Sequence, residues 1–258
     1  MLPALLLSAP AIAQKDVVQA KTTEAKKTMT WTTKSAQARE LASKAADHYM
    51  NAEHEEAYKQ FSNALKLDPE FTIALAYMSN LTKGEVKKTY VQKTLKSAAN
   101  KTEGEKLFAS LVEPGLDAAK RRDIVAKLRL LYPDGAMINT MYVNTRETPE
   151  ERFEAAQEFL KRFPDKAWIH NSLGYMYLLD KKDNDMAKKH FEKYIEMYPQ
   201  GYNPYDSMGE YYLTIGDMEN AEKYYTLALE KAPFNHSSLA AMENIEQAKK
   251  KKATADKQ

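Results

Sequence analysis

Apolar residues recur every three or four positions along most of the chain after Ser35, with charged and polar residues between them. This spacing predicts short amphipathic helices, because a helix completes one turn in about 3.6 residues. Proline, glycine and helix-capping residues divide the helices into pairs. The sequence predicts the three middle pairs at 74–81 with 86–99, 102–112 with 116–132, and 136–143 with 149–163.

Outside this middle region, a more detailed pattern of bulky, small and aromatic residues recurs. Near the C-terminus it falls first on His170, Leu173, Gly174, Tyr177, Ala187, Phe191, Tyr194 and Pro199, and then on Tyr205, Met208, Gly209, Tyr212, Ala221, Tyr225, Ala228 and Pro233. A third copy near the N-terminus falls on Leu41, Ala45, Ala57, Phe61, Ala64 and Pro69. The two C-terminal closing prolines lie 233 − 199 = 34 residues apart. One residue is inserted in the 181–185 turn of the first C-terminal copy.

This pattern and its period resemble the tetratricopeptide repeat, in which two helices form each unit. The resemblance implies an all-α fold, a right-handed α-solenoid of about six helix-turn-helix repeats. A further helix from Ser237 to about Lys250 has a charged outer face, as a terminal capping helix requires. We therefore predict a solenoid domain over residues 35–252.

The small residues of the pattern have a steric role. Gly174, Gly209, Ala45, Ala57 and Ala221 occupy positions where two helices approach closely, and nearby aromatic side chains fill the remaining space. The residues predicted to pack the repeats together are Leu41, Ala45, Ala57, Phe61, Ala64, Leu173, Gly174, Tyr177, Ala187, Phe191, Gly209, Tyr212, Ala221, Tyr225 and Ala228.

The resemblance also implies that a partner segment binds in the concave groove along the first helix of each repeat. In the last two repeats this predicts groove positions at Asn171, Tyr175, Asn203, Asp206 and Glu210. Because acids stand where a carboxylate-binding groove needs cations, a neutral or basic protein or peptide segment is expected. The alternative is that these five are ordinary solvated helix residues.

Nothing in the sequence indicates catalysis, a metal or a cofactor. The five histidines do not form a metal-binding spacing, and the Asp183-Asn184-Asp185 run lacks the later ligands of a calcium loop. Cysteine is absent, which excludes disulfides and thiolate chemistry. The net charge of +2 is close to balance, so nucleic acid is not an expected partner. We predict that the chain is not an enzyme and binds no cofactor.

The N-terminal residues differ in character from the rest. A leucine-rich patch precedes Ala11-Ile12-Ala13, which resembles the end of a secretory signal peptide cleaved after Ala13. A buried amphipathic helix is the alternative, and Pro3 and Pro10 count against it. We predict a signal peptide at 1–13, a flexible leader at 14–34 and a disordered tail at 253–258. The mature chain would then be periplasmic, in a Gram-negative envelope, without membrane insertion.

Two functions fit these features. The first is a scaffold that binds a protein or peptide in the solenoid groove. The second is an accessory module of an envelope enzyme such as a serine hydrolase, because the Asn203-Pro204-Tyr205-Asp206-Ser207-Met208 segment resembles repeats that follow some secreted hydrolases. The sequence gives neither the partner nor the oligomeric state.

Overall fold

The computed structural model describes residues 27–255. The predicted signal peptide, the cleavage site after Ala13 and part of the predicted leader and tail lie outside this range. Thirteen α-helices fill most of the described chain, joined by short turns. They are α1 (Ala36–Met50), α2 (His54–Leu67), α3 (Thr72–Leu81), α4 (Gly84–Ser97), α5 (Glu103–Ser110), α6 (Ala118–Leu131), α7 (Ala136–Asn144), α8 (Pro149–Arg162), α9 (Trp168–Tyr175), α10 (Asn184–Met197), α11 (Asn203–Thr214), α12 (Met218–Lys231) and α13 (His236–Ala255).

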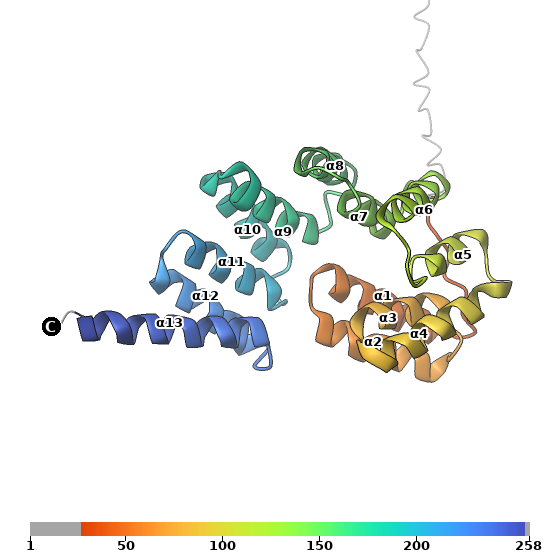
Figure 1. Ribbon diagram of the computed structural model, residues 1–258, viewed down its shortest axis with the longest axis horizontal. Helices are drawn as coiled ribbons and strands as arrows, with labels where there is room; N and C mark the ends of the chain where they lie inside the picture. The colour runs from red at the N-terminus through yellow and green to blue at the C-terminus, as the bar shows by residue number, and fades with distance from the viewer. Residues whose placement is uncertain (1–26, 256–258) are drawn as a thin grey trace, which may run out of the picture.

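The helices form six successive antiparallel pairs followed by α13, and the pairs curve around an open centre (Figure 1). This arrangement confirms the predicted all-α solenoid of helix-turn-helix repeats. Helix α13 extends to Ala255, past the predicted end of the solenoid at residue 252. It packs Ile245 against Ala221 and Tyr225 of α12 and leaves most of its other face exposed.

Local sequence signals account for the helix starts. Thr102 and Thr148 each accept a hydrogen bond from a backbone N–H three residues later, while Glu105 and Glu151 accept one from the backbone at the cap. These capping boxes satisfy N–H groups that have no partner inside the helix. Pro149 follows its cap at the first helical position, where a missing N–H costs nothing.

The extra residue of the fifth repeat is taken up inside a helix, not in the 181–185 turn where the sequence analysis placed it. Residues Met176–Lys181, which continue α9, form a π-helix. A π-helix has one more residue per hydrogen-bonded turn than an α-helix, so it absorbs an insertion without shifting the partner helix. Lys182 then adopts a left-handed conformation with φ of 56° and begins the turn to α10.

Residues 27–34, which we call the N-terminal strap, run in an extended conformation against three different repeats. The Thr32 amide and hydroxyl each donate to the Glu105 carboxylate at 2.7 Å, and Thr33 Oγ1 donates to Asp68 at 2.6 Å. The Lys27 amide donates to Asp134 at 2.9 Å. The described part of the predicted flexible leader thus has specific partners in the solenoid. Besides these acids, Arg39 and Lys101 donate to its backbone carbonyls, and Trp31 packs against Phe71.

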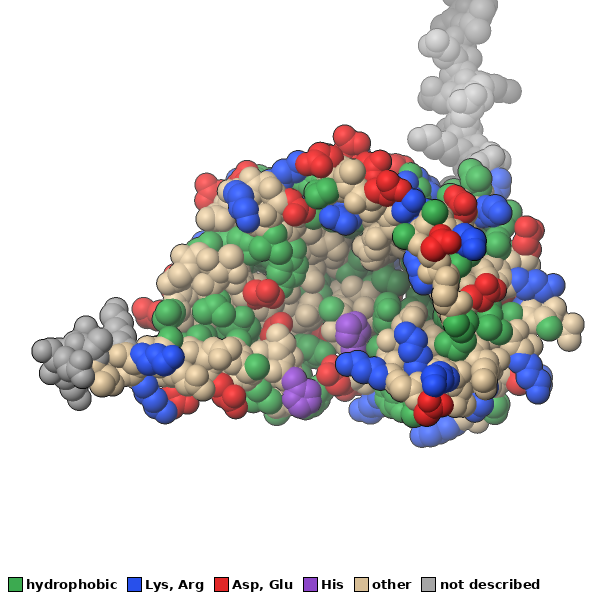
Figure 2. All heavy atoms as spheres, viewed as in Figure 1, with side chains coloured by type: hydrophobic (Ala, Val, Ile, Leu, Met, Phe, Trp, Pro, Cys, Tyr) green, Lys and Arg blue, Asp and Glu red, His purple; other side chains and the backbone are tan. Residues whose placement is uncertain are grey.

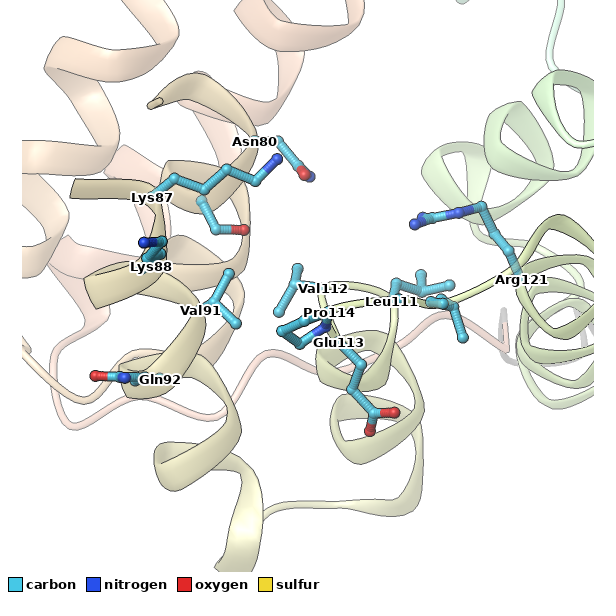
Figure 3. Close-up of a pocket in the computed structure, with 13 residues that line it drawn as sticks. Asn80, Lys87, Lys88, Val91, Gln92, Leu111, Val112, Glu113, Pro114 and Arg121 are labelled. Atoms are coloured by element: carbon cyan, nitrogen blue, oxygen red, sulfur yellow. The ribbon is translucent and has the colours of Figure 1, made fainter. Parts of the chain in front are cut away.

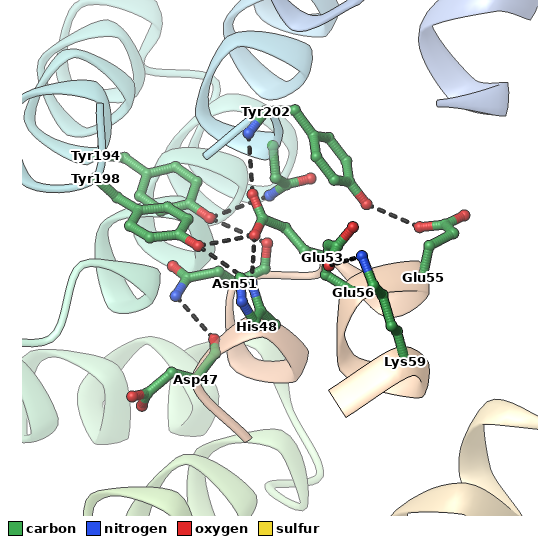
Figure 4. Close-up of polar contacts among 11 residues, drawn as sticks. Asp47, His48, Asn51, Glu53, Glu55, Glu56, Lys59, Tyr194, Tyr198 and Tyr202 are labelled. Carbon is green, nitrogen blue, oxygen red and sulfur yellow. Dashed lines mark hydrogen bonds and ion pairs between the residues drawn. The ribbon is translucent and has the colours of Figure 1, made fainter. Parts of the chain in front are cut away.

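The first repeat touches the fifth and sixth through polar side chains (Figure 4). Glu53 lies in the turn between α1 and α2. Its carboxylate accepts hydrogen bonds from the Tyr198 hydroxyl at 2.7 Å and from the Tyr202 amide at 2.9 Å. The Tyr202 hydroxyl donates to Glu55 at 2.8 Å, and the Tyr194 hydroxyl donates to the Asn51 carbonyl at 3.2 Å. We call these six residues the closing contact, because they join the two ends of the arc.

The centre of the closing contact, at Glu53, is buried and tightly fitted. The Glu53 side chain is only 3% exposed, and His48 Nδ1 lies 2.7 Å from its carboxylate. This hydrogen bond raises the pKa of His48 above its usual value. Gly201 leaves the space that the contact needs, because a Cβ there would lie 2.6 Å from Glu53 Oε1 and 2.1 Å from the Tyr198 ring.

Candidate functional site

Two neighbouring hollows lie in the N-terminal half of the described chain and share part of their lining. The first, of about 570 Å³, opens between α3, α4 and the loop that joins α5 to α6. The second, of about 450 Å³, is lined by α1, α3, α5, α6 and α7. Asn80, Leu111, Val112 and Arg121 line both, so the two hollows form one depression, which we call the N-terminal groove.

The N-terminal groove lies on the concave side of the solenoid, because the first helices of the first four pairs all contribute to the second hollow. Figure 2 shows this face hollowed near the middle of the molecule. The neighbouring hollow, of about 380 Å³, shares Arg121, Asn144 and Thr145 with the groove and extends it toward Glu147. A bound segment would therefore contact several repeats at once.

The floor of the groove is apolar. Val91 of α4 and Leu111 are buried at 7% and 8% exposure, and Val112 beside them is half-buried. Tyr49, Phe108 and other apolar side chains continue this floor into the second hollow. Such a surface gains free energy when a partner's apolar side chains cover it, at about 25 cal/mol per Å².

Two cations face each other across this floor. Figure 3 shows Lys87 extending from α4 and Arg121 from α6, each with its charged end directed into the space between the walls. Among the described residues, neither side chain has a hydrogen bond or ion pair. The neighbouring cations differ, because Lys88 pairs with Glu85 at 2.6 Å and Arg122 pairs with Glu147.

Three carboxamides complete the polar lining. Asn80 and Gln92 line the first hollow, and Asn144 lines the second. All three are exposed, and none makes a side-chain hydrogen bond to another described residue. A carboxamide has both donor and acceptor atoms, so it suits the amide and carbonyl groups of an extended peptide.

The sequence-predicted partner groove in the last two repeats is organised differently from the expectation. Asp206 is 8% exposed, and its carboxylate accepts from Asn235 Nδ2 at 3.2 Å, from Ser237 Oγ at 3.3 Å and from Ser238 Oγ. Burial raises the pKa of Asp206, although these hydrogen bonds oppose the rise. The prediction that Asp206 offers a free carboxylate to a partner is wrong, because it holds the start of α13 against α11.

Of the other four predicted groove residues, three form hydrogen bonds within the chain. Tyr175 donates to Glu210 at 2.6 Å, and its pKa is raised by burial and by that carboxylate. Asn203 is buried and donates to the Tyr194 hydroxyl at 3.2 Å, while Asn171 is half-buried with its Oδ1 unpaired. Glu210 is exposed. These side chains therefore lie near one another without forming a free acidic pair.

The residues predicted to pack the repeats lie at helix contacts. Leu41, Tyr177 and Tyr212 are half-buried, and the others are buried, namely Ala45, Ala57, Phe61, Ala64, Leu173, Gly174, Ala187, Phe191, Gly209, Ala221, Tyr225 and Ala228. A Cβ at Gly174 would lie 2.7 Å from the Phe191 ring, and one at Gly209 would lie 2.9 Å from the Tyr225 ring. Each glycine thus lets an aromatic ring of the partner helix sit on its backbone.

The histidines of the fifth repeat form a packed pair. His170 Nδ1 lies 2.9 Å from His190 Nδ1, and Tyr177 stacks on the His190 ring. Burial lowers the pKa of His170 to about 4 and also lowers the pKa of His190, which favours the neutral form of both rings. Across residues 27–255, no three His, Asp or Glu side chains are grouped so that they could hold a metal ion.

Sequence reasoning missed the N-terminal groove because the repeat pattern is weak there. Lys87 and Arg121 occupy none of the positions that the pattern defines, and they lie 34 residues apart, since 121 − 87 = 34. That separation equals one repeat period, which was the only available signal that they could face each other.

The sequence and the fold were compared with known proteins. The tetratricopeptide repeat model matches residues 169–200 and 202–235, which supports the tetratricopeptide repeat family for this chain. No curated protein matches significantly. Within the described residues, no helix is both long enough and apolar enough to cross a membrane.

Solved structures share the architecture at low sequence identity. The APC/C hetero-tetramer Cut9-Hcn1 aligns with a TM-score of 0.50 and 14% identity over 81% of this chain and 42% of the other, which supports the fold alone. A tetratricopeptide protein of Thermus thermophilus aligns at 0.39 with 16% identity, over 81% and 99% of the two chains. PilW, a type IV pilus biogenesis factor, aligns at 0.47 with 13% identity, also over 81% and 99%.

Proposed function

We propose that this protein is a non-catalytic scaffold that binds an extended segment of a protein partner in its N-terminal groove. The observation that supports this most strongly is the groove itself, where an apolar floor adjoins charged and amide side chains without partners. Tetratricopeptide folds commonly mediate interactions between proteins and are typically non-catalytic. Neither nucleic acid nor membrane insertion is part of this proposal.

We also propose that the protein is exported and works in the periplasm of a Gram-negative envelope. The support is the apolar patch followed by Ala11-Ile12-Ala13 and a polar run, the pattern of a signal peptide. Under the second candidate function, the partner would be an envelope enzyme such as a serine hydrolase, and the scaffold would regulate or position it. The same groove would serve both.

Site-specific photocrosslinking in the native cells tests the binding role. A benzoylphenylalanine at Asn80 or at Asn144 places the reactive group in the groove, whereas Lys93 on α4 is exposed and is not among the residues that line these hollows. We expect a discrete protein adduct from both groove positions and none from Lys93. Equal adducts at all three positions, or none in the groove, would contradict the proposal.

The same preparation tests export. Mass spectrometry of the recovered protein should give a mature N-terminus at Gln14 or close to it. An intact Met1 in the cytosolic fraction would reject the periplasmic location, and the crosslinking result would still stand on its own. Peptide fragments of the adduct would identify the partner and so distinguish an enzyme from a non-enzymatic partner.

A further inference from the structure

We infer that the segment bound in the N-terminal groove carries an acidic side chain whose carboxylate lies between Lys87 and Arg121, with apolar residues beside it. This inference rests on the proposed function and adds the chemistry of the partner. It starts from the two unpaired cations, which approach from opposite walls of one hollow (Figure 3).

The arrangement of Lys87 and Arg121 does not help the isolated protein to fold. Like charges repel, and among the described residues no acid forms an ion pair with either cation. Three cations and one acid line the first hollow, giving a formal charge of 3 − 1 = +2. The acid, Glu113, points away from the space between the walls in Figure 3, and Lys88 also points away. An anion supplied from outside would bind between Lys87 and Arg121 and relieve the repulsion.

The chemistry of the lining favours a carboxylate on a peptide. A guanidinium binds a carboxylate through two parallel hydrogen bonds, and a lysine can add a third from the opposite side. Val91, Leu111 and Val112 lie directly beside the charges, so apolar side chains next to the acid would be buried. Excluding water from this floor would also strengthen the charge interaction.

The carboxamides extend the site along a peptide backbone. Asn80 lies at the edge of the first hollow near Lys87, and it also lines the second hollow (Figure 3). Asn144 stands in the second hollow, whereas Gln92, four residues after Lys88 on α4, directs its carboxamide away from the space between the walls in Figure 3. Backbone hydrogen bonds to the Asn80 and Asn144 amides would hold an extended segment of several residues, with the acid over the Lys87–Arg121 pair.

Blocked, fluorescein-labelled heptapeptides provide the direct probe. Their central residue is Glu, Gln or Lys, the flanking positions are varied among Leu, Ile, Val and Phe, and fluorescence anisotropy with the full-length protein measures binding. We expect the Glu-centred pool to bind at least about tenfold more tightly than its Gln-centred match, the usual magnitude for a charge-assisted hydrogen bond. The Lys-centred pool should bind least.

Variants of the protein assign the effect to residues. Arg121→Gln and Lys87→Gln should each remove most of the preference for Glu, and Lys88→Gln is the matched control on the same helix. The preference should also decline between about 50 and 500 mM salt, because exposed charges are screened. Circular dichroism would verify that each variant retains its helices.

Three results would overturn the inference. They are no preference for Glu over Gln, an equal loss of preference in Lys88→Gln, or crosslinks from Asn80 that fall on residues 1–26 of the same chain or on a second copy. Groove crosslinks to a partner whose binding ignores Arg121→Gln would reject the acidic chemistry alone. Absence of any groove crosslink would reject the proposed function instead.

Discussion

The N-terminal groove and the last two repeats, which lie in the two halves of the solenoid, differ in whether their polar side chains already have partners. In the last two repeats, Asp206 and Glu210 accept hydrogen bonds from the same chain, and Asp206 fixes the capping helix. In the N-terminal groove, the side chains of Lys87, Arg121 and three carboxamides have no hydrogen-bond or ion-pair partner among residues 27–255. The two repeats that follow the pattern most closely therefore engage these acids within the chain.

This difference shows that the repeat pattern identifies the residues that pack the helices and does not identify those that bind a partner. The pattern records which residues let one helix pack on the next, so it is strongest where packing is most regular. Binding depends on side chains that packing does not constrain, and those are the residues that the pattern leaves undefined. The predictions below compare the two halves, beginning with the largest expected effect.

Reversing the charge of the buried Asp206 should destabilise the fold far more than reversing the charge of the exposed Glu210. Asp206→Lys would bury an ammonium group against Asn235 and Ser238 and remove the anchor of α13. We expect a loss of at least about 3 kcal/mol in the free energy of unfolding, typical of an uncompensated buried charge. Glu210→Lys should cost less than about 1 kcal/mol because Glu210 is exposed.

Urea unfolding followed by circular dichroism measures both variants. If Asp206→Lys and Glu210→Lys had the same small effect, Asp206 would have to be accessible to solvent, and the contrast between the two halves would fail.

Removing the Glu53 carboxylate from the closing contact should destabilise both ends of the arc. Glu53→Ala leaves the Tyr198 hydroxyl and the Tyr202 amide without their acceptor. We expect a loss of about 1–3 kcal/mol, the usual cost of leaving buried donors unpaired. Glu56→Ala is the control, because Glu56 lies nearby in α2 and forms its ion pair with Lys59, at 3.7 Å, within the same helix.

Hydrogen exchange would locate the effect of Glu53→Ala. Amides near residue 202 should exchange faster, as should those of the turn between α1 and α2. Faster exchange confined to the first repeat would mean that the C-terminal repeats do not depend on the contact.

Acidification should change the contributions of His48 and His170 to folding stability in opposite directions. The pKa of His48 is raised by Glu53. Its contribution to the stability of the fold is therefore fully present below the unfolded-state pKa of about 6.5 and is lost as pH rises through the folded-state pKa. Asp47 and Glu56 add to this rise. The pKa of His170 is lowered to about 4, so its neutral form favours folding, and stability falls as pH drops from about 6.5 toward 4.

The unfolding midpoint measured from pH 8 to pH 4.5 tests these signs. His170→Gln should lose less stability than wild type below about pH 6.5, and His48→Gln should lose the stabilisation that wild type gains between about pH 8 and pH 6. The same pH dependence in both variants and wild type would show that neither imidazole changes its charge on unfolding.

Local rules were enough to predict most of the fold. The period of the apolar residues predicted six helix pairs and a final helix, and Thr102 and Thr148 were predictable as caps from their neighbours alone. The bond from Asp206 to Ser238 was not predictable, because it joins residues 32 apart across a boundary between repeats. Lys87 and Arg121 were missed for a related reason, since a side chain without partners leaves no pattern in sequence.

The closing contact has a consequence for how the chain folds. In an open repeat array each unit meets only its neighbours, so one end can unravel while the other persists. Here Glu53 bonds to Tyr198 and Tyr202, at sequence separations of 145 and 149 residues. Such pairs raise the contact order, and the entropy of closing so long a loop is lost before the bonds form. During folding, we therefore expect the docking of the two ends to be the slow final step. During unfolding, we expect the whole solenoid to lose its structure as a single cooperative unit.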